Sequence, residues 1–536
     1  MTKSVIIIND SRKTETFKIN WRVMMGTVSV ASGESVCKIS PAENAKQEFT
    51  FTVPQVTGKT AARIEADVRG EFGALKVAPF ELQFWPQKNE RQRLENWALF
   101  DPEGTTAAAF ARAEIRPGLG MLRPEDSLPK SLRVLVIGSL ALKKHSGAKL
   151  FADLSDRIAD GLQVLVMPQD EETLKRVFGM RAFTPGSRQV WIRDRFNPVF
   201  AGLEDSDFAD WRGATSLGPL AEQARTLVED QRYKLVWRCS REGVVASTLA
   251  EKPHSTAFRP LIDVGFDLRY TALWEAREGR GRMIFCQLDL DDRLGKEPAV
   301  DLLMRNLVKS LSTPPAESMV RLQPKELFST EKAVIASMAG KVLILRRGSA
   351  QWLAAGGAEI VSDHLKEGGV VTAFGLNMDD GEALAAAAGD TFGVDRVTLW
   401  KNPLDPRRMP EAFAGLSSAD TSWRKRLEAV RVYAVLPGSW RSETGALAVA
   451  KSSTGQVVWV AATADDFDTE QRPDLIFTKV KTARLEKIIL ANLGVDTASM
   501  PLWSSCLGPA GKPLPEFPLY MDKRQPRDDP YAYMRW

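Results

Sequence analysis

Apolar and polar residues alternate along the N-terminal part of the chain, which predicts β-strands there. Strands are expected at 5–8, 16–23, 48–53, 62–68 and 79–84, separated by turn-forming clusters at 9–11, 32–34 and 69–70. In the second strand Phe17, Ile19, Trp21 and Val23 fall on one face. Residues 1–86 are therefore expected to form an all-β sandwich.

The pattern changes after Trp85-Pro86. Strands and helices then alternate: a strand at 97–100, a helix from Thr105, a strand at 132–137, a helix at 150–159 and a strand at 162–167. Such alternation predicts a mainly parallel sheet with helices on both faces. This first α/β domain is expected to span 96–312, with a closing helix at 299–311 and a break at Thr313-Pro-Pro315.

One stretch recurs and organises the rest of the chain. Phe200-Ala-Gly-Leu203, followed by Trp211-Arg212, returns as Phe413-Ala-Gly-Leu416, followed by Trp423-Arg424. Each copy is preceded by two apolar runs and closed by a helix containing Asn-Leu, at 306–307 and 492–493. Solenoid repeats span about 20–50 residues, whereas this spacing is about 200 residues, so two duplicated α/β domains are predicted, 96–312 and 329–495.

Residues 496–536 are rich in proline and polar residues and are expected to form an extended C-terminal tail. We expect Tyr531, Tyr533 and Trp536 to dock on a neighbouring domain, because clustered large apolar side chains seldom stay in water.

Composition narrows the function. The 536 residues contain 72 Lys and Arg against 68 Asp and Glu, a net charge of +4, and these charges are interspersed, which argues against a nucleic-acid groove. No apolar run approaches the roughly 20 residues of a membrane span, and the first residues do not predict a signal peptide. The chain is cytoplasmic at face value, but it would be exported if it belonged to a longer protein, so the localisation stays open.

Motifs for metals, cofactors and nucleophiles are missing from the sequence. The 4 Cys are widely separated and only 3 His occur, so neither a metal site nor a redox motif is predicted. No glycine-rich dinucleotide motif or P-loop occurs, so no cofactor is expected. A dyad of Cys239 and His254 is conceivable, but no strand-to-helix elbow supports a nucleophile.

Carboxylates at predicted strand ends are the best ligand-binding candidates. Asp263, Asp267 and Asp289 lie where α/β folds bind ligands, and two carboxylates about 5–10 Å apart could do glycosidase chemistry. The preferred interpretation is that they cap turns and bond their own backbone, which would lower their pKa.

Trp211 and Arg212 could stack on a sugar. Their recurrence at 423–424 favours a structural corner instead. No residue is assigned a catalytic role.

Five segments carry a resemblance to a known family: 197–203, 210–213, 251–253, 263–268 and 281–289. They resemble the C-terminal region of large bacterial proteins of glycoside hydrolase family 2, the β-galactosidase group. The strands around 6–10 and 21–22 look like the immunoglobulin-like domain that precedes that region, and 529–536 looks like its end. The resemblance implies an immunoglobulin-like sandwich followed by α/β domains of the flavodoxin or amidotransferase kind.

The catalytic unit of that family is a (β/α)₈ barrel with two glutamates, and this chain has no room for one before the first α/β domain. The resemblance therefore implies glycan metabolism for the parent protein and an accessory role for this chain in packing, assembly or glycan binding. Its partner would be the catalytic part of a glycosidase or a glycan. The alternative is a glycoside hydrolase whose carboxylates lie in the first α/β domain.

Overall fold

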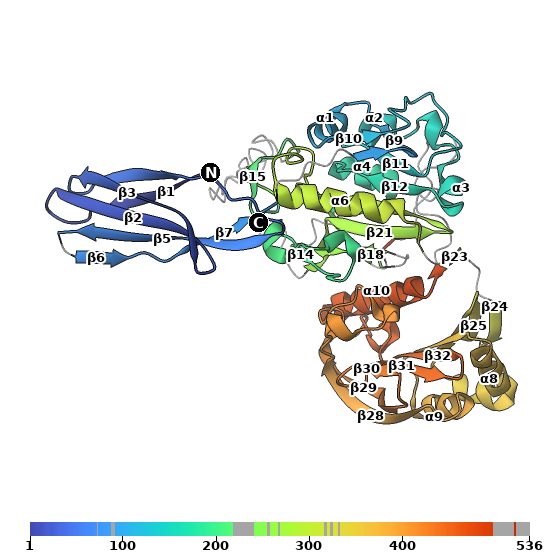
Figure 1. Cartoon of the computed structure of the whole chain (residues 1–536). Helices are drawn as coiled ribbons and strands as arrows, with labels where there is room; N and C mark the ends of the chain where they lie inside the picture. The colour runs from blue at the N-terminus through green and yellow to red at the C-terminus, as the bar shows by residue number, and fades with distance from the viewer. Residues whose placement is uncertain are drawn as a thin grey trace. The chain divides into compact units, whose positions relative to one another are not determined.

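The structure is a computed structural model, and it describes residues 1–71, 73–86, 92–217, 241–254, 258–265, 268–315, 319–321, 325–330, 333–496 and 519–520. The chain divides into two compact units, Met1–Glu90 and Arg91–Trp536. The first is all-β and the second is a mixed α/β unit that contains two large sheets (Figure 1). The chain is thus a multidomain protein with an all-β part and an α/β part.

The N-terminal unit consists of antiparallel strands. They are β1 (Thr2–Ile8), β2 (Glu15–Met25), β3 (Val28–Ile39), β4 (Asn44–Thr50), β5 (Thr60–Gly70), β6 (Gly73–Lys76) and β7 (Phe80–Phe84). One sheet pairs β1 with β4, and the other has the order β3-β2-β5-β6, with β7 also paired to β5. Phe17, Ile19 and Val23 are buried in the core with Phe49 and Phe51, as their alternation predicts.

One predicted turn in this unit is wrong. Ser32-Gly33-Glu34 lies inside β3, and the chain reverses instead at Gly26, whose φ is 58°. Gly33 is required for packing, because a Cβ on it would lie 2.6 Å from the ring of Trp21 on the paired strand. A glycine inside a strand often marks such a close approach.

The first sheet of the second unit has the strand order β18-β21-β22-β12-β11-β9. Its strands are β9 (Trp97–Phe100), β11 (Val134–Ile137), β12 (Gln163–Val166), β18 (Arg259–Pro260), β21 (Leu273–Glu278) and β22 (Gly281–Cys286). The pairs from β9 to β22 are parallel, and β21 and β18 are added antiparallel.

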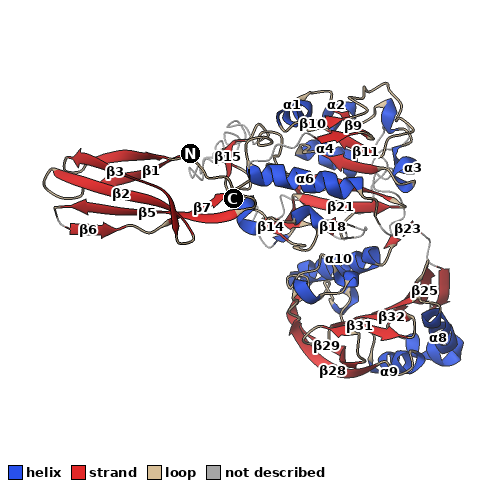
Figure 2. Cartoon of the chain, viewed as in Figure 1, coloured by secondary structure: helices blue, strands red, loops and turns tan. Residues whose placement is uncertain are grey.

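The helices around this sheet are α1 (Thr105–Arg112), α2 (Leu142–His145), α3 (Leu154–Ala159), α4 (Glu171–Phe178) and α6 (Pro298–Ser312). The helices α3 and α4 share one apolar core with alternate residues of the strands, and α6 lies along the sheet (Figure 2).

The second sheet has the strand order β24-β25-β26-β27-β32-β31-β30. Its strands are β24 (Lys325–Ser329), β25 (Val334–Ala339), β26 (Val342–Arg346), β27 (Val370–Phe374), β30 (Trp440–Arg441), β31 (Leu447–Ser452) and β32 (Gly455–Val460). One face packs on α8 (Ala358–Lys366) and α9 (Met378–Ala387), and the other packs on α10 (Ile476–Asn492). A shorter helix, α7 (Ser349–Trp352), follows β26.

The expectation of a mainly parallel sheet is wrong for this second sheet. Only β26, β27 and β32 of its described strands pair in parallel. The other neighbours are antiparallel. The reason lies in the connections: tight turns such as the one at Gly340 between β25 and β26 form hairpins, which only antiparallel strands can use.

The two sheets share one order of strands. In the first, β11, β12, β22, β21 and β18 follow one another, and in the second β26, β27, β32, β31 and β30 do so. The orientations match as well, with two parallel pairs followed by two antiparallel pairs. Val134–Ile137 and Val342–Arg346 therefore occupy equivalent places in their sheets.

The other described strands lie outside these sheets, and most of them are short. They are β8 (Gln92–Leu94), β10 (Ile115–Pro117), β13 (Ala182–Phe183), β14 (Trp191–Ile192), β15 (Trp211–Ala214), β16 (Glu242–Gly243), β17 (Leu249–Glu251), β19 (Ile262–Asp263), β20 (Tyr270–Thr271), β23 (Val320–Arg321), β28 (Phe392–Lys401), β29 (Ser422–Val435) and β33 (Val495–Asp496).

The C-terminal segment is described only at β33 and at Leu519 and Tyr520. Leu519 is buried in the core of the first sheet, and the Tyr520 hydroxyl accepts a hydrogen bond from Arg181 N and donates one to Glu251 O, each at 2.9 Å. Tyr531, Tyr533 and Trp536, which we expect to dock, lie outside the described residues.

Candidate functional site

Equivalent loops lie beside the closing helix of each α/β sheet. Phe200 and Phe413 end the 3₁₀ turns η2 (Pro198–Phe200) and η7 (Glu411–Phe413). Asn306 on α6 donates to the carbonyls of Val199 and Ala201 at 3.0 and 2.9 Å. Asn492 on α10 donates to those of Ala412 and Ala414 at 3.1 and 2.8 Å. The repeated Asn thus holds the repeated loop in both places.

The glycine of each loop is needed for its backbone conformation. Gly202 and Gly415 have φ of 77° and 75°, the left-handed region that residues with a Cβ seldom adopt. Phe200, Leu203, Phe413 and Leu416 are all buried.

Trp211 and Arg212, two of the predicted ligand-binding residues, point to different environments. The Trp211 ring is buried beside Phe208, and its Nε1 donates to Asp207 O at 2.8 Å. The Arg212 side chain is mostly exposed and lies 3.8 Å from the carboxylate of Glu297. The two side chains therefore form no common surface for stacking on a sugar ring.

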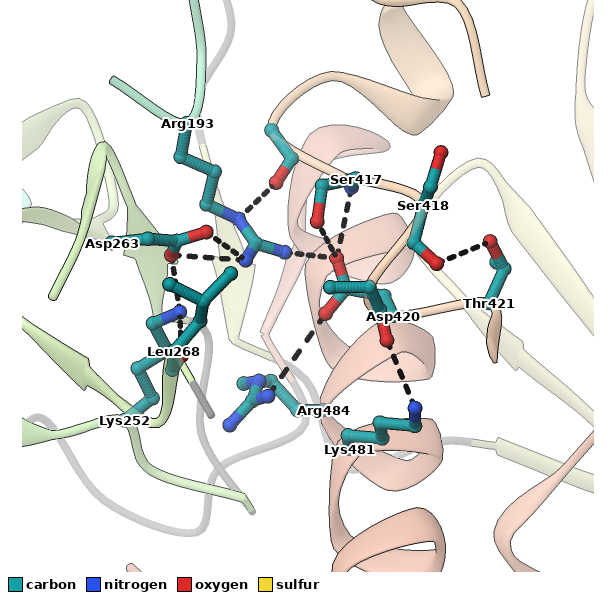
Figure 3. A network of polar contacts seen from close by, with 12 residues as sticks. Arg193, Lys252, Asp263, Leu268, Ser417, Ser418, Asp420, Thr421, Lys481 and Arg484 are labelled. Carbon is teal, nitrogen blue, oxygen red and sulfur yellow. Dashed lines mark hydrogen bonds and ion pairs between the residues drawn. The ribbon is translucent and has the colours of Figure 1, made fainter. Parts of the chain in front are cut away.

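Asp263 lies at the end of β19, in a buried network of charges (Figure 3). Its two oxygens accept from Arg193 Nη1 at 3.1 and 3.2 Å, and Lys252 Nζ donates to Oδ1. Arg193 follows β14, the antiparallel partner of β19, so strand pairing brings these two residues together. Lys252 follows β17 and also donates to the carbonyl of Leu268 at 2.7 Å.

The same Arg193 reaches the loop between η7 and β29, in the part of the chain that forms the second sheet. Its Nη2 donates to Asp420, and its Nε donates to Gly415 O at 2.6 Å, in the repeated loop (Figure 3). Asp420 also accepts from Ser417 N at 2.9 Å and lies 3.9 Å from Arg484 Nη2 on α10. One arginine therefore joins a carboxylate of β19, beside the first sheet, to a carboxylate of the loop before β29, beside the second sheet.

Burial and neighbouring charges set the protonation states here. Burial raises the pKa of Asp263, but the charges of Arg193 and Lys252 outweigh it, so the pKa lies below its ordinary value. Asp420 behaves in the same way, with Arg193 and Arg484 lowering its pKa. Burial lowers the pKa of Lys252 to about 7. The charges of Arg193 and Arg484 lower this pKa further, whereas the charge of Asp263 raises it.

A cavity of about 100 Å³ adjoins this network. The first sheet's side contributes Arg193, Glu251, His254, Leu268 and Arg269, and the second contributes Ala419, Asp420, Arg424, Phe477, Thr478, Val480, Lys481 and Arg484. Neither Asp263 nor Asp289 lines it.

Asp289 lies in another place, where β22 leaves the sheet. It is buried, and Ser247 donates to it from Oγ at 2.6 Å and from N at 3.2 Å. Burial raises the pKa of Asp289 to about 6, although the hydrogen bonds from Ser247 lower it. The expectation that turn bonding would lower this pKa is therefore wrong, because desolvation of a fully buried carboxylate outweighs the bonds it receives.

Asp291, which is not among the predicted ligand-binding residues, lies two residues further along. Thr106 Oγ1 donates to it at 3.0 Å, and burial raises its pKa to about 6. Asp101, at the end of β9, is also buried with a raised pKa, mainly from burial. One carboxylate oxygen of Asp101 and one of Asp291 are buried without a hydrogen-bond partner. This carboxyl edge of the parallel strands is where α/β folds bind ligands.

The remaining candidates are only partly described. Asp267 and Cys239 lie outside the described residues. His254 is buried against the Tyr520 ring, and burial with the charges of Arg484, Arg181 and Arg269 lowers its pKa to about 2. Cys286 is a buried strand residue, and its burial raises the pKa of the thiol to about 12.

No group of three or more His, Cys, Asp or Glu among the described residues is placed to hold a metal ion. In the same part of the chain, no helix is long and apolar enough to cross a bilayer.

Sequence reasoning found Asp263 and missed its partners Arg193 and Lys252, as well as Asp420 and Arg484, which extend the network. One signal was available: Asp420 lies four residues after Leu416, as Asp207 lies four after Leu203. Both carboxylates accept the backbone N–H that follows the leucine, at 2.8 Å for Glu204 N and 2.9 Å for Ser417 N. The duplicated Asp is thus a loop-capping residue, and the second copy also uses it to bind Arg193.

Comparison with known proteins gives only distant likenesses. No family model matches the sequence, and no curated protein matches it. A solved structure of β-glucuronidase 2 from Bacteroides uniformis, a calcium-binding mutant, is 9% identical, with a TM-score of 0.14, covering 31% of this chain and 21% of its own. A cycloisomaltooligosaccharide glucanotransferase from Paenibacillus sp. is 13% identical, with a TM-score of 0.15, covering 36% of this chain and 28% of its own.

The chain thus spans only 21% and 28% of the length of these two carbohydrate-active enzymes. A similarity of this extent assigns neither a family nor an activity to the chain.

Proposed function

We propose that this chain is a non-catalytic accessory region of a carbohydrate-active protein, with a role in domain packing, assembly or glycan binding. The observation that carries the proposal is the state of Asp263. Both of its oxygens are occupied by Arg193 and Lys252, and its pKa is lowered. A glycosidase acid needs a carboxyl group that is protonated and faces the substrate, so Asp263 is suited to joining the two α/β sheets and not to acid catalysis.

The finer fold assignment belongs to the same proposal. We infer that the N-terminal unit is an immunoglobulin-like sandwich. We also infer that the two α/β sheets are diverged copies of one amidotransferase-like domain. The shared strand order and the equivalent Asn306 and Asn492 contacts support the duplication. The sequence resemblance to glycoside hydrolase family 2 proteins supports a carbohydrate setting, with the catalytic part of a glycosidase or a glycan as the partner.

The test is turnover of chromogenic galactosides, glucuronides and mannosides by the purified chain. We expect no turnover above that of a heat-denatured sample. Binding of the corresponding oligosaccharides, measured by calorimetry, separates a glycan-binding role from a purely architectural one.

The alternative is a glycoside hydrolase that uses the carboxyl edge of the first sheet. Asp289 and Asp291 favour it, because both have a pKa raised to about 6, the direction that a general acid needs. Clear turnover by the parent chain that is lost in Asp289→Asn or Asp291→Asn would establish this alternative. Turnover that persists in both variants would contradict the accessory role and assign the chemistry to other carboxylates.

A further inference from the structure

One wall of the cavity between the two α/β sheets includes a face of the helix α10. Thr478, Lys481 and Arg484 follow one another at intervals of three residues on α10, so their side chains leave the same side of the helix. The opposite wall includes Arg193 and Arg269 from the first sheet's side. The cavity therefore has donor groups on both of its walls.

Two polar atoms of this helix face are buried without a hydrogen-bond partner. They are Nε of Arg484 and Oγ1 of Thr478. Both can donate a hydrogen bond. Leaving a buried donor unpaired is unfavourable, and nearly all buried polar groups in folded proteins have a hydrogen-bond partner. Two of them on one face of α10, both in residues that line the same cavity, call for an acceptor there.

The charge around the cavity also favours an acceptor that carries negative charge. Five basic side chains line it, those of Arg193, Arg269, Arg424, Lys481 and Arg484, against the two acidic ones of Glu251 and Asp420. Both acids are already shared: Asp420 between Arg193 and Arg484, and Glu251 between Arg269 and Arg181. Basic groups therefore remain in excess over the carboxylates that face them.

The titration of nearby groups is consistent with this excess. Burial lowers the pKa of Lys481 to about 8. The charge of Asp420 opposes this decrease, and the charges of Arg424 and Arg484 add to it. The pKa of His254 falls in the same way, by burial and by three arginine charges. A positive potential at the cavity destabilises further cations and attracts an anion.

We propose that this cavity binds one small oxyanion, which Arg484 and Thr478 hold by hydrogen bonds and whose charge Lys481 and Arg424 balance. The volume of about 100 Å³ is above the roughly 10–15 Å³ that one water needs. It is below the roughly 300–1,000 Å³ of sites for larger organic ligands. Because the anion would contact both α/β sheets, its binding stabilises their association. This inference goes beyond the proposed accessory role and does not depend on it.

The test is thermal unfolding and titration calorimetry of the whole chain with inorganic phosphate, sulfate or sodium glucuronate. Sodium chloride at matched ionic strength and neutral glucose serve as controls. We expect a rise in Tm with at least one oxyanion and no comparable rise with chloride or glucose. A response to phosphate or sulfate identifies a free ion, and a response to glucuronate alone identifies the carboxylate of a sugar acid.

Variants locate the binding. Thr478→Val removes the hydroxyl with little change of shape and is expected to weaken anion binding about fivefold, and Arg484→Met should weaken it about tenfold or more. Two controls should bind like the parent: Thr482→Val, whose hydroxyl bonds Thr478 O within the helix, and Lys296→Met, which removes an exposed charge. No oxyanion response beyond chloride overturns the proposal. An oxyanion response in Thr478→Val equal to that of the parent also overturns the proposal. This second variant keeps the proposal testable if Arg484→Met fails to fold.

Discussion

Arg193 and Asp420 form a buried ion pair between the two α/β sheets, with side chains 1% and 2% exposed. Asp263 shares the same guanidinium from the side of the first sheet. The charges of the two carboxylates raise the pKa of Arg193 despite its burial, so it stays charged. The pairing costs desolvation energy on both sides, and its main consequence is geometric: the carboxylates fix how the two sheets meet.

We predict that Arg193→Met will destabilise the association of the two sheets by about 3–5 kcal/mol, because Asp263 and Asp420 lose their common partner in a buried site. In calorimetry, the second sheet should then unfold in a separate, earlier transition. Arg195→Met is the matched control: its ion pair with Asp205 is half exposed and should contribute at most about 1 kcal/mol. A single transition at the parent temperature in Arg193→Met would contradict the prediction.

Trp211→Ala should lower the free energy of unfolding by about 3–5 kcal/mol, because it removes a buried ring from the core. Arg212→Ala, at the neighbouring exposed position, should change it by less than about 1 kcal/mol. Chemical denaturation measures both. If Trp211→Ala left stability unchanged and abolished glycan binding, the tryptophan would be a ligand-binding residue and not a packing residue.

The repeated asparagines give a paired prediction. Asn306→Ala and Asn492→Ala each remove two hydrogen bonds to backbone carbonyls, so each should cost about 1–3 kcal/mol. The costs should be similar because the contacts are equivalent in the two sheets. A loss confined to one of the two variants would argue against equivalent roles of the two loops.

Asp289 gives a prediction about pH. Its pKa is about 6 in the folded chain, above the 3.9 or so of an unfolded aspartate, so the folded state holds more protons between these values. Its contribution to stability is therefore full below about pH 4 and declines as pH rises to about 6.

The parent chain should accordingly lose up to about 3 kcal/mol relative to Asp289→Asn between pH 4 and pH 7. The measurement is denaturation of both chains across this range. His254, with a pKa lowered to about 2, contributes in the opposite direction in both chains, so only the difference between them is informative. Asp156→Asn, on an exposed part of α3, should show no such trend.

Tyr520→Phe tests the docking of the C-terminal segment. The substitution removes the hydrogen bonds that the hydroxyl makes with Arg181 N and Glu251 O, so it should cost about 1–3 kcal/mol. Limited proteolysis after 496 should also become faster than in the parent. Equal proteolysis rates would show that the hydroxyl contributes nothing to docking.

The sequence by itself determined the local elements. The alternation at Phe17, Ile19 and Val23 gave the buried face of β2, and apolar runs placed β11, β12, β26 and β27. The repeated Phe-Ala-Gly-Leu stretch was detectable because a glycine in the left-handed region and buried aromatic and aliphatic side chains leave a local signature. These features depend on neighbours close in sequence, so a pattern can reveal them.

Only the tertiary structure decided strand direction, protonation and the contact between the sheets. Whether β25 and β31 pair in parallel depends on which connection closes into a hairpin, and a strand's own residues do not encode that. The pKa of Asp263 and that of Asp289 shift in opposite directions, although both aspartates follow apolar strands, because one meets Arg193 and the other meets mainly desolvation. Arg193 and Asp420 are more than 200 residues apart along the chain, and packing of the folded sheets alone brings them into contact.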